Sequence, residues 1–148
     1  MVFVKINKTN YLVNLIHLWI PVLMWALFIF SFSSVTTPQI AEDHWQDFFI
    51  KKLAHLIEYG VFSLLLFRAL KGSGFNSNKA FLYSLSISIV YGITDEFHQS
   101  FTPGREPTVR DATIDGLGSL SVLLAIRYLL PVSPGSFKRF MLKLGVKY

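Results

Sequence analysis

Long apolar runs dominate the chain, and four of them approach the length of a membrane-crossing helix. They cover about residues 16–33, 53–70, 80–99 and 112–130, and Pro- or Gly-containing turns separate them. A helix needs about 20 mostly apolar residues to cross the hydrocarbon core of a bilayer. The pattern therefore predicts an all-α protein with one integral membrane domain over residues 1–148, built as a four-helix transmembrane bundle.

The first run follows Lys5 and Lys8, so in outline it also fits a signal peptide. We favour a spanning helix, because the run is longer than a usual signal core, contains Trp19 and Pro21, and has no Ala-x-Ala exit.

Composition agrees with a membrane protein. The 148 residues are 52% hydrophobic and only 16% charged, where soluble domains average about 25%. A net charge of +5 in so apolar a chain points to lipid headgroups as the counter-charge, not to nucleic acid. The chain has no cysteine, which excludes disulfides, thiol nucleophiles and Cys-based zinc sites.

The charges segregate between the two sides of a four-span topology. Ten of the 14 Lys and Arg residues lie on the side of both termini, and all nine acids lie on the other side with Lys51, Lys52, Arg105 and Arg110. Basic residues mark the cytoplasmic side of membrane proteins. We therefore expect both termini in the cytoplasm and the acidic face outside.

Two amphipathic segments flank the predicted spans. In residues 137–144 apolar side chains recur at i, i+3, i+4 and i+7 among basic ones, which predicts a short basic C-terminal helix on the anionic inner leaflet. Aromatic residues at i, i+3 and i+4 in 45–49 suggest an interfacial helix leading into the second span. Gly116 and Gly118 predict close packing of the fourth helix.

Ionisable residues inside or at the end of a spanning helix are costly and are by default functional candidates. Here they form three groups, all at the outer ends of their helices. The groups are Lys52, His55 and Glu58; Asp95, Glu96, His98 and Gln99; and Asp111 and Asp115.

The same residues also have structural explanations. His55 and Glu58 would form a hydrogen-bonded pair near the interface, and Asp111 would cap the start of its helix. The second group lies at a helix C-terminus, where the helix dipole disfavours anions. We expect a cation to compensate these acids, with Arg105 as the first choice, whereas Arg110 would extend to lipid headgroups.

Taken together, the groups leave three kinds of chemistry open. His55 or Glu58 would serve acid/base catalysis, and Arg105 would hold an anionic headgroup through a bidentate phosphate contact. Oxygen ligands would instead suit a divalent cation such as Mg²⁺ or Ca²⁺. The candidate ligands are Glu58, Asp95, Asp111 and Asp115.

The three groups belong to longer motifs. These are Lys52-x-x-His55-x-x-Glu58-Tyr59, Asp95-Glu96-x-x-Gln99-x-Phe101-x-Pro103-Gly104-Arg105 and Asp111-x-x-x-Asp115-x-x-Gly118, and Phe32-Ser33-Ser34 precedes them. The chain thereby resembles VanZ-like membrane proteins over about residues 28–120. The D-E-x-x-Q-x-F-x-P-G-R element is the specific one. The family commonly has Asn where this chain has Asp115, which adds a possible charge to an acidic site.

The resemblance implies a multi-pass protein of the bacterial cytoplasmic (inner) membrane. The name-giving member is associated with low-level resistance to the glycopeptide teicoplanin, which implies a role at the cell envelope. Glycopeptides act on wall precursors outside the membrane, in agreement with the outward-facing acidic side predicted above.

Our leading hypothesis is an outward-facing polar site that engages a membrane lipid or a lipid-linked wall precursor. Acid/base or catalytic candidates are His55, Glu58, Asp95, Glu96, Gln99 and Asp111, and candidates for binding substrate or phosphate are Lys52, Tyr59 and Arg105. The alternative is a non-enzymatic interaction protein in which the same residues form a structural network. An ion or proton pathway is disfavoured, because the inner halves of the spans contain no acids to continue a relay.

Overall fold

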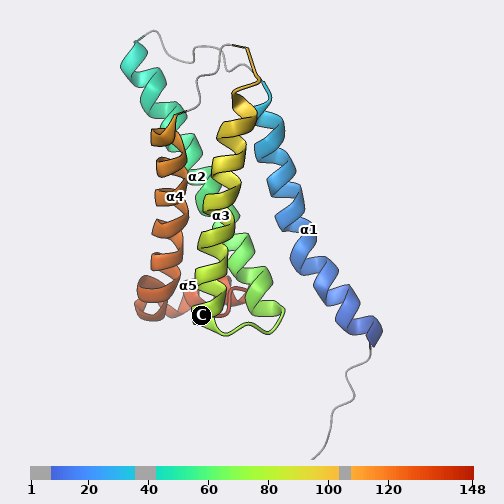
Figure 1. The fold of residues 1–148 in the computed structure, drawn as a ribbon. Coiled ribbons are helices and arrows are strands. Elements are labelled where there is room, and N and C mark those ends of the chain that lie inside the picture. The colour runs from blue at the N-terminus through green and yellow to red at the C-terminus, as the bar shows by residue number, and fades with distance from the viewer. Residues whose placement is uncertain (1–7, 36–42, 104–107) are drawn as a thin grey trace, which may run out of the picture.

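The computed structural model describes residues 8–35, 43–103 and 108–148, and the regular secondary structure in these ranges is all helical, without a strand (Figure 1). This confirms the all-α prediction. The helices are α1 (Lys8–Ser33), α2 (His44–Gly72), α3 (Ser77–Gln99), α4 (Val109–Leu124) and α5 (Gly135–Lys143). After α4 the chain continues helically as a π turn, Ala125–Leu129, and a 3₁₀ turn, Leu130–Val132.

Three segments of the described chain are long and apolar enough to cross a membrane: Val13–Ser33, Trp45–Gly72 and Val109–Val132. The predicted fourth span corresponds to α3, which forms where expected but is not among these segments. Its buried face carries Ser84, Ser88 and Gly92 before the acids, and these small or polar residues lower its hydropathy. The crossing of the membrane by α3 stays a prediction.

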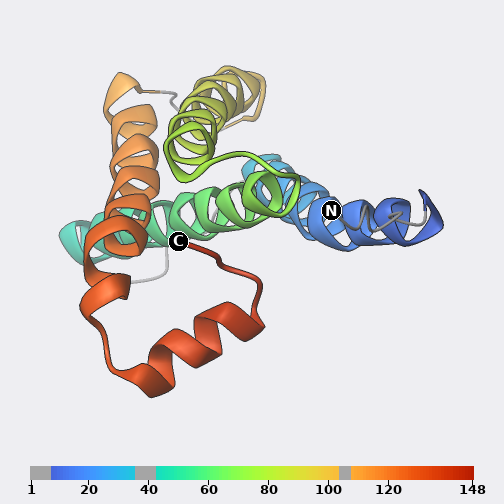
Figure 2. The ribbon, with the colours of Figure 1, turned by 90° about the horizontal axis from the view of Figure 1, so that it is seen from below.

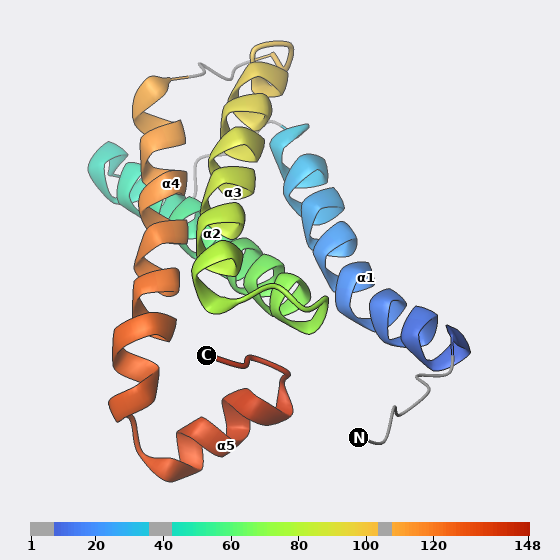
Figure 3. The same ribbon diagram turned by 60° about the horizontal axis from the view of Figure 1, so that its bottom comes forward.

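The helix α2 contacts each of the other three long helices and crosses behind α3 and α4 (Figures 1 and 3). Seen from below, α3 and α4 lie on one side of α2, and α5 lies on the other (Figure 2). The N-terminal half of α1 diverges from its neighbours (Figure 3). The aromatic segment 45–49, predicted as an interfacial helix, is the continuous first part of α2.

Small residues bring α2 and α4 close together. A Cβ on Gly118 would collide with the backbone carbonyl of Leu56, so only glycine fits there. Beside it, the Ser119 hydroxyl donates a hydrogen bond to the Tyr59 carbonyl oxygen at 3.1 Å. The packing predicted for Gly118 is confirmed, whereas a Cβ on Gly116 would make only an ordinary contact with Ile89 at 3.6 Å.

The C-terminal segment returns to the helices after α5. Val146 is buried in a core cluster with Phe67 of α2 and Leu123 of α4. In contrast, α5 has no buried residue, and its Phe137 and Phe140 are about half exposed. A short helix therefore forms where predicted, and its position on a lipid leaflet stays a prediction.

The fold gathers the described acids toward one end, which we call the acidic end: the C-terminal ends of α1 and α3 and the N-terminal halves of α2 and α4. The opposite, basic end comprises the other ends of these helices and α5. In the described chain the basic end contains Lys and Arg side chains but no acid.

Candidate functional site

Two side-chain contacts, which we call rungs, connect α2 to α4 at the acidic end. The Lys52 ammonium nitrogen lies 2.6 Å from Asp111 Oδ1, and one turn further along, His55 Nδ1 lies 3.2 Å from Asp115 Oδ1. Side chains three or four residues apart share a helix face, so matching spacings on the two helices place the partners opposite each other. The structure therefore joins the first and third of the predicted groups.

Asp115 lies at the centre of this arrangement and is fully buried. Gly92 of α3 provides space for it: a Cβ there would lie 3.4 Å from both Asp115 Cβ and Tyr59 Cε1. Asp115 Oδ2 and the Tyr59 hydroxyl have no hydrogen-bond partner among the described residues. Tyr59 is also fully buried, and its predicted role in binding substrate stays a prediction.

The two acids of α3 are held by N–H donors. Gln99 Nε2 donates to Asp95 Oδ2 at 3.0 Å, and the backbone N–H of Thr108 donates to Glu96 Oε2 at 2.9 Å. Both carboxyl groups are in residues less than one-tenth exposed. Arg105, the cation predicted to compensate them, lies outside the described residues.

The start of α4 corrects one expectation. Thr108, not Asp111, is the N-cap, and its hydroxyl oxygen accepts a hydrogen bond from the Asp111 backbone N–H at 3.2 Å. A Thr immediately before the first helical residue can reach the third N–H of the helix, whereas Asp111 already lies inside the first turn. The Asp111 carboxylate is thus available for Lys52. Arg110 is largely exposed and lies over the Phe48 ring, 4.8 Å from its centroid.

A cavity of about 170 Å³ opens beside these groups, between α1, α2 and α3. Part of its wall is apolar and part is polar. The apolar lining is Ile29, Phe32, Ile50 and Ala54, and the polar lining is Ser33, Lys51, His55, Glu58, Asp95 and Gln99. Asp95 Oδ1 is buried and has no hydrogen-bond partner among the described residues. The site thus combines an unused acceptor with an apolar surface.

Sequence reasoning missed two contacts that attach α1 to this site. The Trp25 indole N–H donates to the Glu58 carbonyl oxygen at 2.9 Å, and the Phe30 ring stacks on His98 with centroids 4.2 Å apart. His98 shares the spacing of its group, but nothing in the sequence identifies an aromatic partner on another helix.

The sequence matches a known family. A family model described as VanZ/LLP1 matches residues 3–130, which is most of the chain and includes all three motifs. The chain belongs to the VanZ/LLP1 family. Neither a curated protein nor a solved structure matches it.

The hypothesis of a divalent-cation site requires several ligands close together in this VanZ/LLP1 protein. Within residues 8–35, 43–103 and 108–148, no group of three or more His, Asp or Glu side chains is placed to hold a metal ion. The four candidate ligands divide between the rungs and the cavity. Asp111 and Asp115 face cationic or imidazole partners on α2, whereas Glu58 and Asp95 line the cavity.

Proposed function

We propose that this VanZ/LLP1 protein is a multi-pass protein of the bacterial cytoplasmic membrane whose outward-facing cavity engages a lipid or a lipid-linked wall precursor. The cavity between α1, α2 and α3 carries the proposal, because it presents apolar and polar walls together. An amphiphile needs both: a surface for its chain and hydrogen-bonding groups for its headgroup.

Three of the predicted site residues, Asp95, His55 and Arg105, have distinct roles in this proposal. Asp95 Oδ1 accepts a hydrogen bond from a hydroxyl or N–H of the headgroup. An ionised Asp115 can only accept, so it keeps the proton of His55 on Nδ1 and leaves Nε2 to exchange a proton with the ligand. Arg105 holds the phosphate, since guanidinium groups bind phosphate in bidentate fashion.

The outward orientation is supported by the charge asymmetry, because the cavity lies at the acidic end and the basic residues mark the cytoplasmic side. A role in teicoplanin resistance, as for the name-giving member, fits an outward site for wall precursors.

A binding experiment tests the proposal. Full-length protein in phosphatidylcholine nanodiscs is titrated with a polyprenyl-diphosphate-linked wall precursor and, separately, with phosphatidylglycerol. We expect saturable binding of one of the two probes. Asp95→Asn should weaken it about tenfold or more, because the amide loses a charge-assisted contact. Asp43→Asn is the matched control: it removes the same charge from an exposed position at the same end and should leave binding unchanged.

A second function competes for the same residues. The rungs Lys52–Asp111 and His55–Asp115 join α2 to α4, as expected of a structural network in a protein that acts by partner contact. In that case the wild type would bind neither probe saturably, and Asp95→Asn and Glu58→Gln would both be tolerated in an envelope-stress assay. Binding that Asp95→Asn weakens at unchanged membrane level supports the ligand site, and absence of saturable binding by the wild type supports the network.

A further inference from the structure

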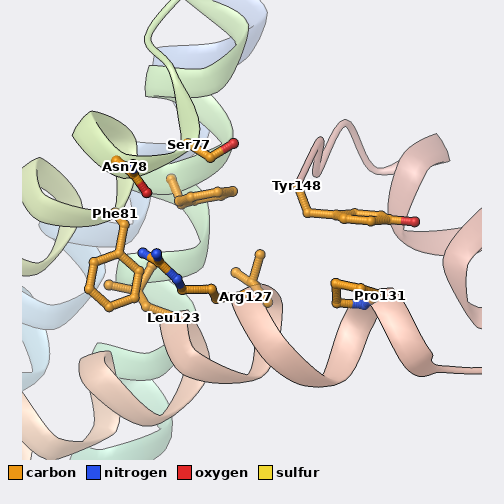
Figure 4. Close-up of a pocket in the computed structure, with 9 residues that line it drawn as sticks. Ser77, Asn78, Phe81, Leu123, Arg127, Pro131 and Tyr148 are labelled. Atoms are coloured by element: carbon orange, nitrogen blue, oxygen red, sulfur yellow. The ribbon is translucent and has the colours of Figure 1, made fainter.

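A second cavity, of about 270 Å³, lies at the opposite, basic end (Figure 4). It lies between α2, α3, the end of the α4 helical run and the C-terminal residue. Arg127, Asn78 and Phe81 form one side, and Pro131 and Tyr148 lie across from them (Figure 4). Phe67, Leu123 and Ile126 complete an apolar lining. We propose that this cavity binds the phosphate headgroup of an anionic phospholipid from the leaflet at the basic end.

Arg127 is the cationic group of this cavity. Its guanidinium lies 5.7 Å from the centroids of both the Phe81 and the Tyr128 rings, and these cation–π contacts do not neutralise its charge. No ion pair involves the Arg127 side chain in the described chain, and the described part of the basic end has no Asp or Glu side chain. A phosphate is therefore the natural counter-ion for this guanidinium.

Polar groups beside Arg127 extend the headgroup site. Ser77 and Asn78 line the cavity, and the Lys71 ammonium donates a hydrogen bond to the Ser77 hydroxyl at 2.8 Å. A second cation thus lies at the edge of the cavity. The hydroxyl and amide suit the glycerol or headgroup oxygens of a phospholipid.

The C-terminal segment fixes the opposite wall. Gly145 turns the chain with a φ of +83°, and the following Val146 is buried in the core and donates its backbone N–H to the Met141 carbonyl at 3.0 Å. Tyr148 is thereby held at the cavity. Because Pro131 precedes α5 and Tyr148 follows it, the basic helix and the cavity belong to the same end of the protein.

The apolar walls favour a phospholipid over a soluble anion. The cavity lies at the end of the candidate span Val109–Val132, where headgroups begin. Its volume is close to the lower bound of about 300 Å³ for small-molecule sites, so it suits a headgroup and the start of one chain. This inference does not rest on the function proposed for the acidic end.

Native mass spectrometry of the full-length protein, released from nanodiscs of phosphatidylcholine or of phosphatidylcholine with phosphatidylglycerol, tests the proposal. We expect one phosphatidylglycerol to be retained and phosphatidylcholine to be lost. Arg127→Gln should weaken retention about tenfold or more, as expected for loss of a charge-assisted phosphate contact. Arg139→Gln removes the same charge from α5, outside the cavity lining, and should keep the lipid.

Three results would overturn the lipid site. They are retention by Arg127→Gln equal to wild type, equal loss in Arg139→Gln, which would indicate diffuse attraction by α5, and displacement of the lipid by inorganic phosphate, which would indicate a soluble-anion site. If Arg127→Gln does not fold, two other measurements decide the question. Arg127→Lys keeps the charge but not the bidentate fork, so it should retain less phosphatidylglycerol than the wild type. The wild type itself should retain phosphatidylglycerol and lose phosphatidylcholine.

Discussion

Asp115 is the most deeply buried acid of the described site. It is a fully buried carboxyl whose nearest hydrogen-bond partner is His55, and its second oxygen has no partner in the described chain. Buried acids of this kind are costly, and removing one partner leaves the other without a hydrogen bond. The carboxyl is therefore either a structural acceptor for His55 or a charge that the site requires.

Substitution of Asp115 separates these two possibilities. Asp115→Asn keeps an oxygen that accepts from His55, whereas Asp115→Leu fills the space and leaves His55 Nδ1 without its partner. We expect Asp115→Leu to lower the free energy of unfolding by about 1–3 kcal/mol. For Asp115→Asn we expect a free energy of unfolding within about 1 kcal/mol of the wild-type value. Thermal unfolding in detergent measures both. If both variants lose the same stability, the charge itself holds α2 to α4.

At the residue scale, sequence reasoning predicted the members of the site better than their partners. Spacing along a helix places Lys52 one turn from His55, and Asp111 one turn from Asp115. It does not give the rotation of α2 against α4, so the two rungs could not be derived. The cap at Thr108 was missed for a related reason: the start of α4 was predicted three residues too late, which placed Asp111 at the N-cap position.

The contact between α2 and α4 sets the geometry of the site at the scale of whole helices. We expect Gly118→Ala to destabilise the protein by roughly 1–3 kcal/mol, because its Cβ meets the Leu56 carbonyl, which belongs to the backbone and cannot move aside alone. Gly116→Ala is the matched control two residues away, with only an ordinary contact at 3.6 Å. Thermal unfolding of both variants measures the difference, and equal effects would mean that helix separation is not limited at Gly118.

Helix positions were predictable where apolar runs are long, and less so where aromatic segments join them. The predicted 80–99 agrees closely with α3, Ser77–Gln99. The second run was placed at 53–70, but α2 begins at His44, because the half-exposed aromatic segment before it continues the helix without a break. Hydropathy also does not reveal that the helix after Leu124 changes to a π turn and then a 3₁₀ turn before Ser133.

Charge segregation is the property of the whole molecule that organises both proposals. Acids and the cavity of the proposed function lie at one end, and the basic helix and the lipid cavity lie at the other. This division corresponds to opposite sides of a membrane only if α3 crosses it together with α1, α2 and α4. A crossing is costly for a helix with serines and buried acids, unless the neighbouring helices enclose its polar face.

Labelling of single cysteines determines whether α3 crosses. The chain has no cysteine, so each introduced thiol is unique. Asp43, Phe75, Phe101 and Ser136 are exposed and lie in or next to the four successive connections. If the chain has four spans and its basic end faces the cytoplasm, an impermeant maleimide added to intact cells should label Asp43→Cys and Phe101→Cys only. Permeabilised cells should label all four. If α3 does not cross, Phe101→Cys becomes protected and Ser136→Cys becomes labelled, and α3 and the acidic end of α4 would then lie on the cytoplasmic side.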